Sequence, residues 1–141
     1  MGKLLDFIID NPVDNLTEEI YLTHKRFKNP DGSQGQAKLV IKAVTQEENE
    51  DYIKRAQGRR NKKGQQDFNA QEYQMSILIN HVIEPDFKSE EVLQALGVSL
   101  PREAVNKYLL SGEIIEIVSK ITELSGFNDD PNEGIDEIKN S

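Results

Sequence analysis

The segment PREAVNKYLLSGEIIEIVSKITELSGF, residues 101–127, constrains the fold most, because its apolar residues recur at helical intervals. Pro101 suits a first helical position, where its missing N–H would have no intrahelical partner. Gly126 follows the last periodic residue and can take the left-handed conformation that ends a helix. Between the halves, Ser111 and Gly112 either kink one long helix or separate two helices, and the sequence leaves both open. We therefore expect a helical domain built around this segment.

A period of two residues occurs nearer the N-terminus. Apolar and polar residues alternate in two runs, which include Ile20 and Leu22 in the first and Leu39, Ile41 and Ala43 in the second. The residues between the runs include Asn-Pro-Asp-Gly, which is typical of a turn. We expect a β-hairpin at about residues 18–44, with a mobile tip. A lone hairpin is marginal in water, so its apolar face should pack on the helices.

Helix end signals divide the rest of the chain. Thr45 and Glu48 have the spacing of a capping box, and Ser89 suits an N-cap. Pro85 should end a helix because the residue before a proline is disfavoured in the α conformation. The helices are expected at about residues 45–57, 69–83, 89–96 and 101–125. The fold class is therefore α+β, a mainly α-helical single domain over residues 1–127 with an N-terminal β-hairpin packed on a helical layer.

Both ends of the chain have distinct compositions. Leu4, Leu5, Ile8 and Ile9 can share one side of a short helix that stops before Asn11-Pro12. This helix either packs on the core, which we favour, or docks on a neighbouring subunit or another protein. At the other end, residues 128–141 are acidic and carry few apolar side chains, so we expect a flexible tail.

Composition limits the partners. The formal net charge of -8 and the pI near 4.8 argue against nucleic acid as the main partner. No apolar run approaches the roughly 20 residues that cross a bilayer, so no membrane partner is expected. The absence of cysteine excludes disulfides and thiolate metal sites and fits a cytoplasmic protein.

One strongly basic run interrupts this acidic chain. It comprises Lys54, Arg55, Arg59, Arg60, Lys62 and Lys63. Such a run can bind phosphates, which would make the chain a small nucleic-acid-binding regulator that uses the basic loop at residues 54–63. We favour a solvated, flexible loop, because no aromatic side chain lies among the charges to stack on bases.

Catalytic and metal-binding patterns are weak. The two histidines, His24 and His81, have no second histidine nearby in sequence, and His81 fits a helix face or the core. A calcium loop in the tail fails because Pro131 and Asn140 stand where ligands are needed. Phosphate-binding glycine loops and nucleophile elbows are also missing. We therefore expect no enzyme, no cofactor and no metal site.

Three segments together carry a family resemblance. They are LLDFIIDNPVDNLTEEI at the start, INHVIEPDF in the middle and SGEIIEIVSKITELSGF near the end. In this order they resemble the XkdN-like phage tail assembly chaperones of tailed phages and prophages of Gram-positive bacteria. The long hairpin tip, NPDGSQGQ, matches no feature of that family.

The resemblance implies a non-catalytic role. Such proteins are made next to the tape measure protein, a long helical chain that sets tail length, and are thought to coat it until tail tube subunits polymerise around it. Related families make a longer, frameshifted product that recruits the tube protein. The resemblance thus implies a protein of the host bacterial cytoplasm that is absent from the mature virion, and a homo-oligomer stays open.

The partner surface is expected near the break in residues 101–127, where apolar side chains are too crowded for all of them to face the core. Our candidates for partner binding are Leu109, Leu110, Ile114, Ile115, Ile117 and Phe127. The alternative, that all of them belong to the core, is equally open.

Overall fold

The computed structural model describes residues 2–13, 16–60, 63–64 and 66–127. Helices dominate, and two small antiparallel sheets accompany them, which confirms the predicted α+β class. In chain order the elements are α1 (Lys3–Asp10), β1 (Thr17–Leu22), β2 (Ala37–Lys42), α2 (Gln46–Ala56), β3 (Gln57–Arg60), β4 (Gln66–Phe68), α3 (Ala70–His81), β5 (Val82–Glu84), α4 (Glu90–Leu96), α5 (Pro101–Tyr108) and α6 (Ser111–Leu124). The predicted acidic tail at 128–141 lies outside the described residues.

The predicted hairpin forms most of the main sheet. Strands β1 and β2 pair in antiparallel fashion with Ile20 opposite Leu39, and β5 pairs with the other edge of β2. The alternation seen in the sequence is confirmed, since Ile20, Leu39 and Ile41 are buried and Tyr21 is exposed. The sheet therefore presents one apolar face to the helices.

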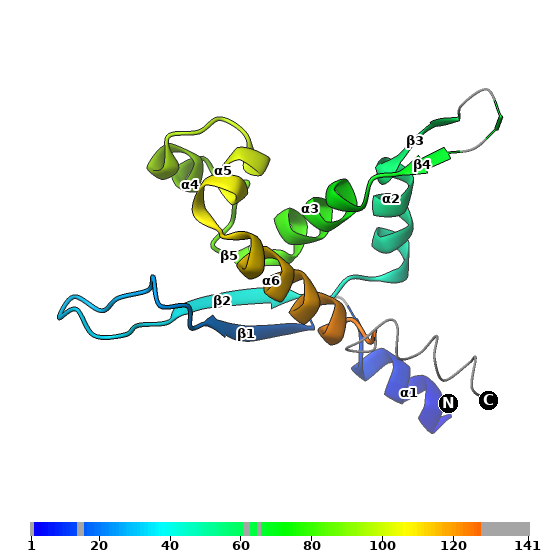
Figure 1. Ribbon diagram of the computed structural model, residues 1–141. Helices are drawn as coiled ribbons and strands as arrows, with labels where there is room; N and C mark the ends of the chain where they lie inside the picture. Colours follow the sequence, from blue (N-terminus) through cyan, green and yellow to red (C-terminus); the bar gives the residue numbers. More distant parts are fainter. Residues whose placement is uncertain (1, 14–15, 61–62, 65, 128–141) are drawn as a thin grey trace, which may run out of the picture.

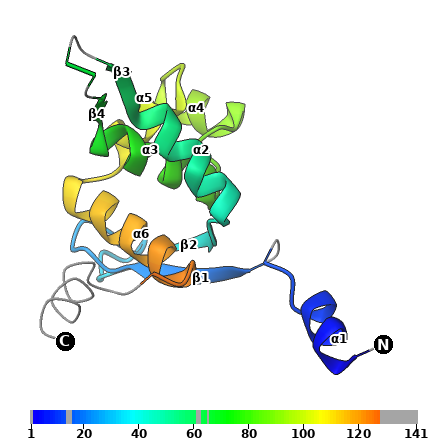
Figure 2. The same cartoon turned by 90° about the vertical axis from the view of Figure 1, so that its right-hand side faces the viewer.

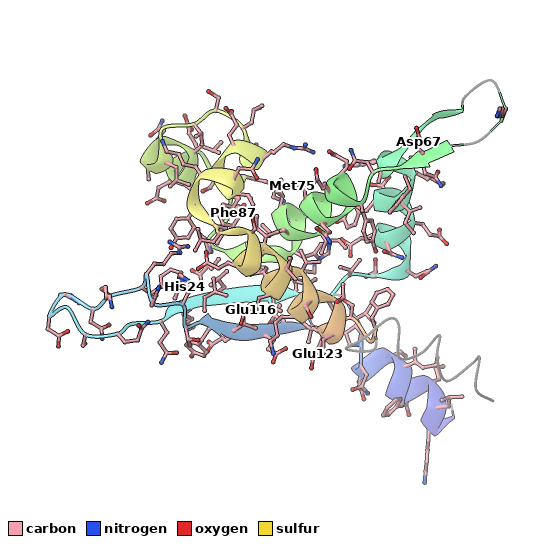
Figure 3. The ribbon with its side chains drawn as sticks, in the orientation of Figure 1. His24, Asp67, Met75, Phe87, Glu116 and Glu123 are labelled. Carbon is pink, nitrogen blue, oxygen red and sulfur yellow. The ribbon has the colours of Figure 1, made fainter. Side chains whose placement is uncertain are left out.

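Helix α6 covers this face and runs across the strands, with α3 beside it (Figure 1). Its residues Ile117 and Ile121 are fully buried, because they lie on the side of α6 that faces the sheet. Phe87, in the link between β5 and α4, is the largest fully buried side chain (Figure 3). On the outer side, Glu116 and Glu123 are exposed to solvent. The segment that dominated the sequence thus lies at the centre of the fold.

The break in that segment separates two helices. Leu109 and Leu110 are both extended, so α5 ends at Tyr108 and α6 begins at Ser111. Pro101 is the first residue of α5, and Gly126 has φ +95°, so both predictions from the sequence are confirmed. The helix-end signals at Thr45 and Ser89 are confirmed as well.

Two strand features were missed. The helix predicted over 69–83 ends at His81, and Val82–Glu84 instead forms β5, because the chain before Pro85 is held extended and pairs with the open edge of β2. The basic run predicted as a loop includes β3, which pairs with β4 in a two-stranded ribbon. The ribbon projects from the body in both views (Figures 1 and 2).

Helix α1 forms as predicted but does not pack on the core. None of its residues is buried, and Phe7 and Ile9 are more than 60% exposed. It extends beyond β1, away from the sheet and the other helices (Figures 1 and 2). The favoured prediction of a packed N-terminal helix is therefore wrong.

Candidate partner-binding surface

An ion pair fixes the junction between α5 and α6. Arg26, just beyond β1, donates from Nε to both carboxylate oxygens of Glu113 at 3.1 and 2.9 Å and from a terminal nitrogen to Glu113 Oε1 at 2.8 Å. The same terminal nitrogen donates to the carbonyl oxygen of Tyr108 at 2.8 Å. Glu113 Oε1 also accepts from the backbone N–H of Leu110 at 2.8 Å and so caps α6. One carboxylate therefore holds the helix start and the hairpin together.

The charges of this pair shift both proton equilibria. Hydrogen bonds from Arg26 lower the pKa of the Glu113 carboxyl although only 4% of the residue is exposed, and the bonds to Glu113 raise the pKa of Arg26. The guanidinium also lies over the rings of Phe27 and Tyr108, at 4.2 and 5.0 Å from their centroids. The junction is thus charged inside and rigid.

The six residues proposed for partner binding fall into different environments. Leu109 and Ile117 lie in the core, which removes them from the predicted surface, and Ile114 packs against the core. The other three are exposed: Leu110 is 47% exposed, Ile115 is 63% exposed and Phe127 is 47% exposed. The exposed members are split between the two ends of α6, a 14-residue helix about 21 Å long, so they do not form one patch.

At the Phe127 end lies an apolar groove of about 400 Å³. Its walls come from the residues before β1, the link between β2 and α2, and the end of α6. Ser125 joins two of these walls, since its hydroxyl accepts from the backbone N–H of Val44 at 2.8 Å and donates to the carbonyl oxygen of Ile121 at 2.6 Å. Val13 and Leu16, which the sequence did not single out, line the groove and are exposed.

His81 belongs to the core, as expected. It is 1% exposed, its Nε2 lies 2.8 Å from the Tyr52 hydroxyl, and the Glu48 carboxylate lies 3.7 Å away. Burial lowers the pKa of His81 and raises the pKa of Tyr52 to about 12. His81 and Tyr52 are enclosed between α2 and α3 and stabilise the fold, whereas the Glu48 side chain is 37% exposed and lines a shallow charged groove along α2.

Acidic side chains lie close to the basic residues of the ribbon formed by β3 and β4. Arg55 is paired with Asp51 at 2.9 Å, and the groove beside the ribbon contains Asp67 and Glu72.

Across the described residues, no three histidine, cysteine, aspartate or glutamate side chains gather closely enough to hold a metal ion. In the same part of the chain, no helix is long and apolar enough to cross a membrane.

Comparison with protein families supports the resemblance drawn from the sequence. The model of the family described as "Phage XkdN-like tail assembly chaperone protein" matches residues 5–139, which is nearly the whole chain. The chain belongs to this family.

Two relatives of this tail assembly chaperone come from Bacillus subtilis (strain 168). The protein XkdN of the phage-like element PBSX is 29% identical over 106 residues, which cover 72% of each chain. The uncharacterised protein YqbN is 27% identical over 110 residues, which cover 75% of this chain and 72% of YqbN.

The crystal structure of protein YqbN has the same fold. It superposes with a TM-score of 0.64 at 22% sequence identity and covers 91% of this chain and 99% of the YqbN chain. YqbN therefore shares the arrangement of sheet and helices described above.

Proposed function

We propose that this tail assembly chaperone binds the tape measure protein of its own phage or prophage and keeps it in solution while tail tube subunits polymerise. The supporting observation is the exposure of large apolar side chains at both ends of α6, with a groove beside Phe127. A long helical client carries apolar stripes, and a groove with apolar walls suits one turn of such a stripe. The proposal places the protein in the host cytoplasm and outside the mature virion.

Co-expression tests this proposal. The tape measure protein, produced with the chaperone, should stay in the soluble fraction and co-purify with it. Ile115→Asp and Phe127→Ala change exposed side chains, so both variants should fold and should recover less complex than the wild type. Gln94→Asp, on the exposed side of α4, is the control and should recover as much complex as the wild type. A tape measure protein that is equally soluble alone, or that never co-purifies, contradicts the proposal.

A longer frameshifted product that recruits the tail tube protein stays a prediction. The DNA around the stop codon tests it, because a slippery heptamer there, followed by a long open frame, is needed to make such a product. Mass spectrometry of an induced lysogen should then detect both forms. The nucleic-acid hypothesis is not favoured, since the match is to an assembly chaperone family.

A further inference from the structure

Helix α1 is strongly amphipathic and has no partner within the described chain. At 100° per residue, Lys3, Asp6 and Asp10 fall within an arc of about 60°. The apolar residues occupy an arc of about 200°, and they are Leu4, Leu5, Phe7, Ile8 and Ile9, all exposed. A flat surface cannot bury the whole of so wide an apolar arc. Helix α1 therefore fits a groove with two walls.

The groove at the end of α6 has such walls and carries no charge. Its lining residues are uncharged and include Val13, Leu16, Val44, Gln46, Leu124 and Phe127. Phe127 is 47% exposed and Val13 58% exposed, so the rim also presents apolar surface to solvent. The same chain therefore exposes an apolar helix and an apolar groove.

The connection between them directs α1 away from its own groove. The Asn11 side chain donates to the carbonyl oxygen of Phe7 at 2.7 Å, and its backbone N–H donates to the carbonyl oxygen of Ile8 at 3.3 Å. Pro12 then fixes φ, and Val13 is already part of the groove wall. Only two residues separate the helix from this wall, which leaves too little chain for α1 to fold back along it. In Figures 1 and 2, α1 points outward.

We propose that, in the client-free protein, α1 of one copy lies in the α6-end groove of a second copy, and that the two copies exchange these helices reciprocally. One eight-residue helix is about 12 Å long, too short to bury the roughly 800 Å² per partner of a stable interface. Reciprocal exchange doubles the buried area, because each copy gives one helix and receives one. A membrane is a poorer partner, since the polar side of α1 carries Asp6 and Asp10, which anionic lipids repel.

Cysteine trapping tests the exchange on the full chain alone, without a client. The protein has no cysteine, so introduced thiols are unambiguous. Ile8→Cys places a thiol on α1, and Gln46→Cys places one in the groove. When the two purified single variants are mixed and oxidised mildly, we expect a disulfide-linked heterodimer. Glu91→Cys on α4 replaces the groove variant as the matched control and should give at least tenfold less heterodimer.

Sedimentation of untrapped protein gives the second readout. The wild-type chain should dimerise, and Ile8→Asp should raise the dimer dissociation constant at least tenfold. Asp6→Ser, on the polar side of α1, should leave it unchanged. The melting temperature of dilute monomer should be the same in all three, because both positions are exposed.

Three results overturn the proposal. The first is a monomer at all concentrations. The second is a dimer that Ile8→Asp leaves intact. The third is a double variant, Ile8→Cys with Gln46→Cys, that forms its disulfide only within one chain, which would show that α1 occupies its own groove.

Discussion

Arg26 and Glu113 lie 87 residues apart in sequence and form an ion pair with three hydrogen bonds between the hairpin and the first turn of α6. The Glu113 side chain is 5% exposed and that of Arg26 is 29% exposed, so the pair is dry on one side and reaches water on the other. Gly112 and Glu113 belong to the third segment of the family resemblance. Glu113 has a structural role there, because it both caps α6 and anchors the hairpin.

We expect Glu113→Ala to lower the free energy of unfolding by about 3 kcal/mol, the low end for a broken buried pair, since Arg26 can still reach solvent. Urea unfolding at pH 7 measures this. Lys38→Met is the matched control, because its pair with Glu19 is 54% exposed on both sides and should contribute far less to stability. Equal losses from the two substitutions would contradict the assigned role of Glu113.

His81 should make the stability of the domain decrease as the pH falls below about 6.5. Burial lowers its folded pKa below the unfolded value of about 6.5, although Glu48 opposes the shift. Between the two values the unfolded chain binds more protons, so stability is full above pH 6.5 and falls as the pH drops toward the folded pKa. The slope should be at most about 1.4 kcal/mol per pH unit.

Unfolding by urea at pH 5, 6 and 7 measures this slope. Tyr52, Glu48 and Lys42 are the ionisable groups around His81, and they stay in place in His81→Gln, which should flatten the slope. His24→Gln removes the other histidine at an exposed position and should keep the wild-type slope. A slope that survives in His81→Gln would assign the pH dependence to another group.

Two glycines should respond to alanine in opposite directions. Gly126 has φ +95°, where an L side chain is strained, so Gly126→Ala should cost about 1–2 kcal/mol. Gly112 lies inside α6 with nothing near an added Cβ, so Gly112→Ala should gain about 0.5 kcal/mol. Thermal unfolding of the two variants checks this, and the same sign for both would refute the argument.

The sequence pattern, combining periodicity with helix-end signals, predicted a helix in each helical region of the described chain and left open whether residues 101–125 form one helix or two. It missed the ribbon because the described strand residues of β3 and β4, apart from Phe68, are polar or glycine and pair through the backbone. It missed β5 because Val82 and Ile83 also fit the helical period of α3. A short strand forms because it pairs with another strand. The local sequence of β3, β4 or β5 does not show which strand that is.

The exposure of the candidate surface residues could not be predicted from the sequence, for a related reason. The sequence pattern offered Leu109 and Ile117 as readily as Leu110 and Ile115, and only packing in the folded domain decides which are buried. Periodicity likewise gave α1 an apolar side but could not show that the stiff Asn11-Pro12 link keeps it off the core. The ion pair of Arg26 with Glu113 is long-range and leaves no local pattern.

Phe87 and Phe127 should separate stability from partner binding, because each is the phenylalanine of a motif in the family resemblance but their exposures differ. Phe87 is fully buried and touches the Tyr108 ring at 6.5 Å between centroids, so Phe87→Ala should cost about 3–5 kcal/mol. Phe127 is 47% exposed, so Phe127→Ala should change stability by no more than about 0.5 kcal/mol. Urea unfolding and recovery of the tape measure complex, measured on both variants, should show a stable Phe127→Ala protein that recovers less complex. A large loss of stability in Phe127→Ala would instead assign Phe127 to the core.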